Sequence, residues 1–229
     1  MRVLGLVGGT SAESTVVYYQ SLNRLVRERL GGRHSAELVM WSVDFAPYSD
    51  WMAADEWDRV GEGLCAAARK LEAAGAQAIV LCANTMHLMA PRVSEAVRVP
   101  LLHIADATAQ ALKARSVTRP LLLATRFTME KAFYRQRLEA AGLPALVPEQ
   151  PDRERLHAII FDELVKGIIR PESKAEFLQA VQRGRAAGAD GVILGCTEFG
   201  LLVRPDELDL PAVDTAIAHC EAAVEFALA

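Results

Sequence analysis

The stretch AGAQAIVLCANT, residues 74–85, has a second copy in AGADGVILGCTE, residues 187–198. The two stretches align without a gap when Gly75 is placed on Gly188, an offset of 113 residues. In each copy a short apolar run follows a helical pattern and ends at small polar residues, which is typical of a buried strand in a parallel sheet. The repeat therefore predicts two related strands, one in each half of the chain.

A second repeat extends this prediction. RVLGLVGGTSAES, residues 2–14, matches RPLLLATRFTMEK, residues 119–131, at an offset of 117 that places Ser11 on Thr128. Apolar runs alternate with helical patterns along the chain, and the expected strands are 3–9, 37–43, 78–83, 99–104, 120–125, 191–196 and 210–215. This alternation predicts an α/β fold of two pseudosymmetric units, each a mainly parallel sheet flanked by helices.

The repeats also give the expected boundaries of the two units. We expect residues 1–104 with 214–229 to form the first unit, because the C-terminal helical pattern has no strand to cover within the second. Residues 105–213 are the expected second unit. Ligands of open parallel sheets bind outside the carboxyl ends of the strands, so we expect an active-site cleft between the units.

Composition and charge exclude several classes of partner. The chain has 229 residues, 52% of them hydrophobic, which is enough for a packed core. Its formal net charge of −4 shows no bias towards nucleic acid, and no apolar run reaches the roughly 18 residues of a transmembrane helix. The N-terminal apolar stretch is too short for a signal peptide. We therefore expect a cytoplasmic protein that binds neither nucleic acid nor membranes.

The chain has four cysteines, Cys65, Cys82, Cys196 and Cys220, and no C-x-x-C pair. In a reducing cytosol we expect free thiols. Cys65 and Cys220 lie in helical patterns and are expected to be small buried side chains. Cys82 and His87 are close in the sequence, but no second pair of ligands accompanies them, so we expect no metal site.

The register of the first repeat separates Cys196 from Cys82. At an offset of 113, Cys196 is opposite Ala83, and Cys82 is opposite Gly195. Side chains alternate in direction along a strand. If Cys196 points towards a ligand, Ala83 does so in the other unit, and Cys82 points into packing. Cys196 is therefore the candidate catalytic residue, and Ala83 stands where its partner would be.

The loops after the expected strands carry small polar side chains. GGTSAES, residues 8–14, is typical of a turn and a helix start, and Thr10 to Glu13 fits a capping box. The free N–H groups of such a helix start suit a carboxylate or phosphate, but the segment matches neither a P-loop nor a dinucleotide-binding pattern. Four further neutral donors are Asn84, Thr85, Thr128 and Thr197. Each alone is typical of a cap or turn, and together they suit a small carboxylate.

These motifs resemble the aspartate/glutamate racemase family, most closely its broad-specificity bacterial amino-acid racemases. The resemblance rests on LVGGTSAEST with YY, ANTMH, LLAT followed by a second threonine, and LGCTE, and it covers essentially the whole chain. It implies an isomerase, an amino-acid racemase that needs no pyridoxal phosphate or other cofactor and works as a homodimer.

The family uses two cysteines, one from each unit, on opposite faces of the substrate α-carbon. One thiolate removes the α-proton, and the other thiol returns a proton from the far side. The second family cysteine matches Cys196, and the first falls at Ala83, which has no proton to give or take. A free cysteine with a pKa of about 8.5 is mostly protonated at neutral pH, and helix N-termini or hydrogen-bond donors could increase its thiolate fraction.

The resemblance also implies a set of substrate-binding residues. They are Thr10, Ser11, Asn84, Thr85, Thr128, Lys166, Thr197 and Glu198. Lys166 matches a lysine near the active site of aspartate racemases. The arginine that the family carries after its second strand is absent, and Tyr48 stands in its place. The substrate, aspartate, glutamate or a wider set, therefore need not have an acidic side chain.

Two other functions remain open from the residues alone. The superfamily includes arylmalonate decarboxylases that keep only the second cysteine, so a decarboxylase or another carbanion enzyme with one cysteine is an alternative. A catalytically inert carboxylate-binding protein is another. The sequence also leaves open whether Ala83 is natural or a substitution that impairs the enzyme.

Overall fold

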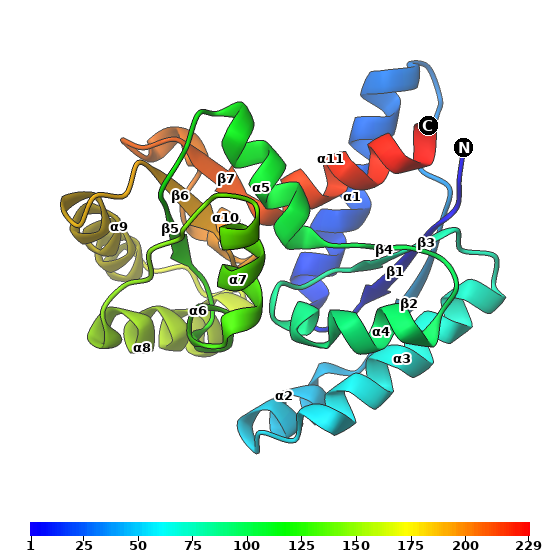
Figure 1. The fold of residues 1–229 in the computed structure, drawn as a ribbon, viewed down its shortest axis with the longest axis horizontal. Coiled ribbons are helices and arrows are strands. Elements are labelled where there is room, and N and C mark those ends of the chain that lie inside the picture. Colours follow the sequence, from blue (N-terminus) through cyan, green and yellow to red (C-terminus); the bar gives the residue numbers. More distant parts are fainter. The chain divides into compact units, whose positions relative to one another are not determined.

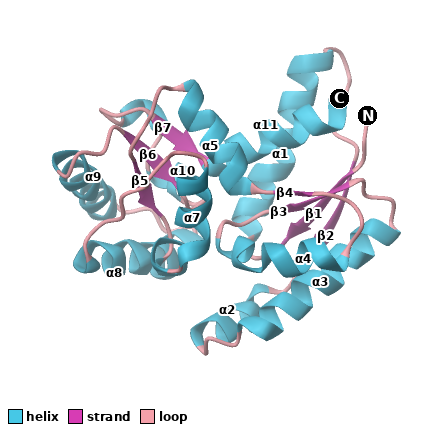
Figure 2. Ribbon diagram, viewed as in Figure 1, coloured by secondary structure: helices cyan, strands magenta, loops and turns pink.

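The computed structural model describes residues 1–229 as an α/β protein with two parallel sheets flanked by helices (Figure 1, Figure 2). The chain divides into two compact units, residues 1–103 with 219–229 and residues 104–218. The second boundary lies after Ala218, inside the last helix, whereas the sequence placed it before residue 214. None of the helices is both long and apolar enough to cross a membrane.

The first unit contains a four-stranded parallel sheet in the order β2-β1-β3-β4. Its strands are β1 (Leu4–Gly8), β2 (Leu38–Ser42), β3 (Ala78–Leu81) and β4 (Leu101–Leu102). Its helices are α1 (Ala12–Leu30), α2 (Phe45–Ala53), α3 (Trp57–Ala73), the 3-10 helix η1 (Thr85–Met89), α4 (Ala90–Ala96) and the last part of α11 (Thr215–Leu228). Figure 1 shows α1 and the end of α11 on one face of this sheet and α3 and α4 on the other.

The second unit contains a three-stranded parallel sheet in the order β5-β6-β7. Its strands are β5 (Pro120–Leu123), β6 (Gly191–Leu194) and β7 (Ala212–Asp214). Its helices are α5 (Ile104–Ala114), α6 (Arg126–Glu130), α7 (Ala132–Ala140), α8 (Gln150–Ala158), the π-helical turn η2 (Ile159–Glu163), the 3-10 helices η3 (Leu164–Lys166) and η4 (Pro205–Glu207), α9 (Pro171–Ala186) and α10 (Phe199–Leu202).

The core of the second unit follows from the alternation of side chains along its strands. Leu121 and Leu123 pack with Leu156 of α8 and Phe177 of α9. Leu122 packs on the opposite face, in a cluster that includes residues of α5 and α7. Both faces of the sheet are therefore covered, which explains why its strands are uninterrupted apolar runs in the sequence.

The two sheets differ at one edge. In the first unit, β2 pairs with β1 through five residue pairs that begin at Leu4 and Leu38. In the second unit the corresponding edge is reduced to a single parallel bridge between Leu121 and Leu146. The backbone around Leu146 still exchanges hydrogen bonds with β5, at Pro120 and Leu122. The Leu146 segment therefore occupies, beside β5, the place that β2 has beside β1 in the first unit.

The strand ladders correct the second sequence repeat by one residue. Leu4 pairs with Ala78 in the first sheet, and Pro120 pairs with Gly191 in the second. Ala78 and Gly191 are equivalent at the offset of 113, so Leu4 is equivalent to Pro120. The offset between these strands is therefore 116 (4 to 120) rather than 117.

The helix caps that follow these strands show why the ungapped alignment fails. Ser11 caps α1 and Thr125 caps α6, and each side chain accepts a hydrogen bond from the N–H three residues later. These caps differ by 114 residues (11 to 125), two fewer than the offset of the strands. The turn in the second unit is therefore two residues shorter, and placing Ser11 on Thr128 was wrong.

The end of α11 is integrated into the first unit. The backbone N–H of Arg2 donates to the carbonyl of Ala227 at 2.8 Å, and the Arg2 guanidinium donates to the carbonyl of Phe226 at 3.0 Å. Cys220 and Val224 are fully buried. The C-terminal helix thus completes the packing around the strand that begins the chain.

Candidate active site

The first group of candidate residues follows β1 and depends on Gly9. Gly9 has a φ of 86°, and a Cβ atom there would lie 2.1 Å from the Val43 carbonyl oxygen. Only glycine fits this conformation and this close approach. The Gly9 N–H donates to Thr15 Oγ1 at 2.8 Å, which fixes the turn against the first turns of α1.

The turn presents Thr10 and Ser11 at the start of α1. Ser11, rather than Thr10, is the N-cap, since its hydroxyl accepts from the Ser14 N–H at 3.2 Å. The predicted capping box from Thr10 to Glu13 was therefore wrong, since the cap is one residue later, at Ser11. The Thr10 side chain is buried, and its Oγ1 has no hydrogen-bond partner. An orphaned hydroxyl beside the free N–H groups of a long helix is suited to an anionic ligand.

Ala83 and Cys196 occupy equivalent places in the two sheets. The Cys82 N–H donates to the carbonyl of Val7 at 3.0 Å, and the Gly195 N–H donates to the carbonyl of Leu123 at 2.7 Å. Cys82 therefore corresponds to Gly195, and the next residues, Ala83 and Cys196, correspond to each other. The register predicted from the sequence is confirmed.

Cys82 is a packing residue. Its side chain is buried, and its thiol points back along the strand to the Val80 carbonyl oxygen at 3.9 Å. Burial raises the pKa of this thiol far above its ordinary value. Ala83 is only partly buried, and the Asn84 and Thr85 side chains that follow it are buried at the end of β3. Because β1 and β3 are neighbouring parallel strands, this segment and the Thr10 turn lie at the same edge of the sheet.

In the second unit, Cys196 follows β6 and forms a compact hydrogen-bonded group with the next two residues. The Cys196 thiol donates to Glu198 Oε2 at 2.9 Å, and the Thr197 hydroxyl donates to the same oxygen at 2.8 Å. Glu198 is buried. Glu198 was expected to contact the substrate, but its carboxylate already binds the candidate catalytic thiol.

Electrostatics hold Cys196 in the thiol form. Burial, followed by the charge of Glu198 and the hydrogen bond to it, raises the pKa of Cys196 well above its ordinary value. The Asp214 carboxylate at the end of β7 adds to this effect. Asp214 is itself desolvated, and burial raises its pKa although the Ala216 and Ile217 N–H groups donate to it. The Glu198 N–H does favour the thiolate, as expected of a local donor, but burial and these carboxylates outweigh it.

The remaining predicted residues of the second unit have different environments. Thr128 is fully buried, and its N–H donates to the Thr125 hydroxyl at 3.3 Å as part of the α6 cap. Lys166 is exposed at the end of η3. The η3 turn contacts α10, which begins directly after Glu198, so Lys166 lies on a segment next to the Cys196 group.

We expect Glu198→Gln to make the Cys196 thiol easier to ionise. The substitution removes the negative charge that opposes thiolate formation, so the pKa of Cys196 falls. The measurement is the rate of iodoacetamide alkylation of Cys196 against pH, followed by peptide mass spectrometry, and its midpoint should move to lower pH. Thr197→Val keeps the carboxylate charge and serves as the matched control. Equal midpoints in Glu198→Gln and the unmodified chain would contradict this account.

The first unit contains a buried cluster of histidines beside the Ala83 segment, which the sequence analysis did not identify. His87 is in η1, His103 follows β4, and His219 is in α11. The ring of His87 lies 4.6 Å from that of His103 and 5.5 Å from that of His219, between centroids. His219 Nε2 donates to the Leu102 carbonyl at 2.8 Å, and its Nδ1 accepts from the Tyr18 hydroxyl at 2.9 Å. Burial lowers the pKa of His219, so the ring is neutral and makes these two hydrogen bonds in a single tautomer.

The cluster is expected to make the protein sensitive to acid. Burial lowers the pKa of His219 to about 4, below the ordinary value of about 6.5. Between these pH values the unfolded chain binds a proton that the folded chain does not. Stability is therefore full above about pH 6.5, and it falls by about 3 kcal/mol from His219 alone as the pH decreases to about 4. Urea unfolding across this range, compared with His219→Asn, measures the effect. Parallel pH profiles for the two proteins would exclude His219 as its source.

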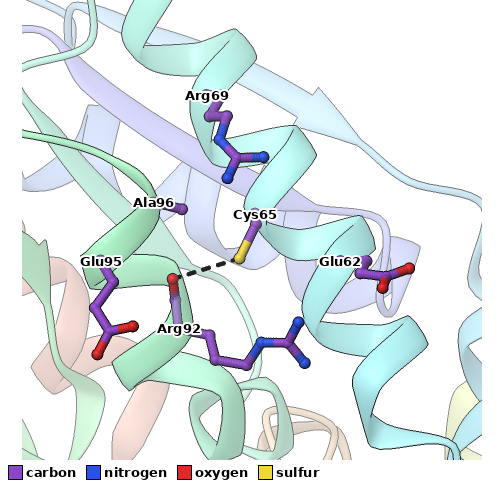
Figure 3. Close-up of a pocket in the computed structure, with 6 residues that line it drawn as sticks. All are labelled: Glu62, Cys65, Arg69, Arg92, Glu95 and Ala96. Carbon is purple, nitrogen blue, oxygen red and sulfur yellow. Dashed lines mark hydrogen bonds between the residues drawn. The ribbon is translucent and has the colours of Figure 1, made fainter.

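A pocket in the first unit lies away from all the predicted site residues. It has a volume of about 370 Å³ and is lined by Glu62, Cys65, Arg69, Arg92, Glu95 and Ala96, from α3 and α4 (Figure 3). The Cys65 thiol donates to the Arg92 carbonyl oxygen at 3.4 Å, and burial raises its pKa. Cys65 is therefore a buried structural thiol, as its helical pattern predicted.

Tyr48 stands where the resemblance led us to look for an arginine. Its side chain is buried and packs against α3, so closely that a Cβ atom on Gly63 would lie 2.2 Å from the Tyr48 hydroxyl. Burial raises the pKa of this hydroxyl. Tyr48 supplies no positive charge for an acidic side chain of a substrate.

Comparisons with known proteins agree with this arrangement. The family model for Asp/Glu/hydantoin racemases matches residues 7–223. A Yersinia pestis structure, provisionally described as an Asp/Glu racemase, is 43% identical and covers 100% of both chains, with a TM-score of 0.92. An aspartate racemase homologue from Pyrococcus horikoshii is 35% identical, covers 100% of both chains and has a TM-score of 0.87. The Bacillus subtilis broad specificity amino-acid racemase RacX is 21% identical over 99% of each chain. The chain therefore belongs to the Asp/Glu/hydantoin racemase family and is an isomerase of the racemase type.

Proposed function

We propose that the protein removes and returns the α-proton of amino acids without a cofactor, with Cys196 as its catalytic thiol. Ala83 stands at the place of the second acid–base group. The proposal requires Cys196 to act on one face of the α-carbon while the Ala83 position lies on the other. It predicts that the enzyme removes the α-proton of one enantiomer faster than that of the other.

The pair of carboxylates beside Cys196 is the observation that carries this proposal. Glu198 and Asp214 both act on the Cys196 thiol, and they make its surroundings negative. A negative environment attracts the α-ammonium group of an amino acid and repels the second carboxylate of a malonate. It therefore favours an amino-acid substrate over the dicarboxylate substrate of a decarboxylase.

The first unit offers complementary groups for the α-carboxylate. The Thr10 hydroxyl is buried without a hydrogen-bond partner, next to the N-terminus of the 19-residue helix α1. Helix N-termini favour anions. Ser11, Asn84 and Thr85 provide further neutral groups at the same edge of the sheet. We propose that these residues bind the carboxylate and that Thr128, Thr197 and Lys166 complete the substrate site.

The substrate side chain need not be acidic in this proposal. Tyr48 is packed against α3 and carries no charge, and Lys166 is exposed. A set of amino acids wider than aspartate and glutamate is therefore proposed. We also propose that the enzyme is a cytoplasmic homodimer, which light scattering of the purified protein would test for the oligomeric state.

The proposed function is tested with a panel of D- and L-amino acids and arylmalonates in D₂O. Loss of the α-proton signal for one or more amino acids supports the proposal. Release of CO₂ from a malonate without amino-acid exchange would instead identify a decarboxylase. Binding of amino acids without exchange by the unmodified chain, with no gain in the Ala83→Cys variant, would identify an inert binding protein.

A further inference from the structure

The segment that carries Ala83 is tied to the buried histidine cluster by one hydrogen bond. His87 Nδ1 lies 2.9 Å from the Ala83 carbonyl oxygen, and the carbonyl can only accept. His87 Nδ1 therefore carries a proton and donates it to this bond. The bond spans the first turn of η1, where the His87 N–H also donates to the Asn84 carbonyl at 3.0 Å.

We propose that His87 is a positioning residue, which orients the Ala83–Thr85 segment through its bond to the Ala83 carbonyl. His103, His219 and Tyr18 hold the His87 ring in place. This inference rests on the proposed function, because the positioned segment is the one that would face the substrate. His87 itself touches no reacting atom.

The packing around His87 explains why the bond is well defined. The His87 side chain is buried, between the His103 ring and the His219 ring. His219 is in turn fixed by Tyr18 from α1 and by the Leu102 carbonyl at the end of β4. Elements from both ends of the chain therefore converge on the ring that holds Ala83. This packing restricts the orientation of the His87 ring.

The charge state of the cluster supports the same role. Burial, and then the neighbouring His103 and His219, lower the pKa of His87 well below its ordinary value. These two histidines are the titratable groups that act on His87 from the β4 end and from α11, and Tyr18 faces the cluster from α1. His87 thus stays neutral across the range in which the enzyme would work. Its bond to Ala83 should not change between about pH 8 and pH 6, a range in which a histidine with the ordinary pKa of about 6.5 gains a proton.

The composition of the chain allows the bond to be observed directly. Asn23 and Asn84 are its two asparagines, and only Asn84 follows an alanine. Labelling alanine with ¹³C at the carbonyl and asparagine with ¹⁵N therefore gives a single carbonyl–nitrogen correlation, from Ala83 and Asn84. The chemical shift of that carbonyl reports the hydrogen bond from His87, with or without a substrate.

Two variants separate positioning from simple packing. His87→Phe fills the space of the ring without a donor, and His87→Asn keeps a side-chain N–H near the place of Nδ1. We expect His87→Phe to move the Ala83 carbonyl signal upfield and to lower kcat/KM for α-deuterium exchange by about 10²-fold, the effect of a small displacement of a catalytic segment. In His87→Asn, the Ala83 carbonyl signal and kcat/KM for exchange should both lie closer to the values of the unmodified chain. Leu64→Ala, a substitution of a fully buried residue in α3, is the control for lost stability.

Each outcome decides the proposal. An unchanged carbonyl signal in His87→Phe would overturn it, as would a moved signal with unchanged exchange kinetics. An equal loss of exchange in Leu64→Ala, at matched fractions of folded protein, would show that stability rather than positioning is responsible. If the unmodified chain exchanges no amino acid at all, the proposed function fails, while the carbonyl signal still decides whether His87 holds Ala83.

Discussion

In the Ala83→Cys variant, racemisation is expected to rise by about 10²–10⁴-fold over the unmodified chain, the range typical of one positioned acid–base group. The structural reason is that Ala83 is equivalent to Cys196 and has no proton to exchange. The unmodified chain should therefore exchange the α-hydrogen of one enantiomer with retention faster than it racemises it. The other enantiomer should react poorly.

The new thiol has room at this position. Ala83 is only partly buried, and a cysteine adds a single heavy atom, so overpacking should not mask the gain. Optical rotation and α-proton loss are measured side by side for both enantiomers and both proteins. Cys82→Ala is the matched control, because the Cys82 thiol packs against β3, at the Val80 carbonyl. Its removal should leave the ratio of exchange to racemisation unchanged.

A specific result would contradict this account. If the unmodified chain already racemises both enantiomers as fast as Ala83→Cys, another group supplies the second proton. Thr10 would be the first to examine, because its buried hydroxyl has no hydrogen-bond partner. Ser11 and Thr85 would follow, although the Ser11 hydroxyl already accepts from the Ser14 N–H.

Cys196→Ser is expected to remove α-proton exchange almost completely, with a loss of about 10²–10⁴-fold. A serine hydroxyl keeps the size of the side chain and can still donate to Glu198, so the hydrogen-bonded group should survive. It cannot form an anion at neutral pH as a thiol can, which removes the base. Exchange with each active amino acid is measured by NMR in D₂O, together with thermal unfolding to confirm that the variant folds.

The pH dependence of α-proton exchange by the unmodified chain is a second test of the role of Cys196. Since burial and Glu198 raise the pKa of Cys196, exchange should increase with pH towards alkaline values. Near-full exchange in Cys196→Ser would remove Cys196 from the mechanism. A Cys196→Ser variant that loses exchange but still binds the amino acid would separate the chemical role of the thiol from substrate binding.

Much of the fold could be predicted because its strands are buried on both faces. All seven expected strands occur, although β4 is only Leu101–Leu102. The equivalence of Ala83 and Cys196 also followed from the sequence, because that repeat has no insertion. The second repeat, residues 2–14 on 119–131, was misplaced by one residue in its strand. It also could not align the helix caps, because the turn before Thr125 is shorter than the turn before Ser11 and apolar residues alone do not reveal this difference.

The sequence does not predict the surroundings of Cys196 and His87 in the same way. The sequence GCTE places Glu198 two residues after Cys196, but it does not show that the Glu198 carboxylate accepts a hydrogen bond from the thiol. Asp214 acts on Cys196 from a different strand. The contact between His87 and His219 joins residues far apart in the sequence, and no local pattern predicts it.

The division of the chain between its two units has a consequence for biosynthesis. Residues 1–103 require residues 219–229 to complete their packing, and Arg2 is hydrogen-bonded to Ala227 and Phe226. As the chain leaves the ribosome, all of residues 104–218 are available before residues 219–229 emerge. The unit that begins the chain is therefore the last to be completed. Until then its sheet lacks the cover of the C-terminal helix, and the nascent chain is most exposed to proteases and chaperones on that face.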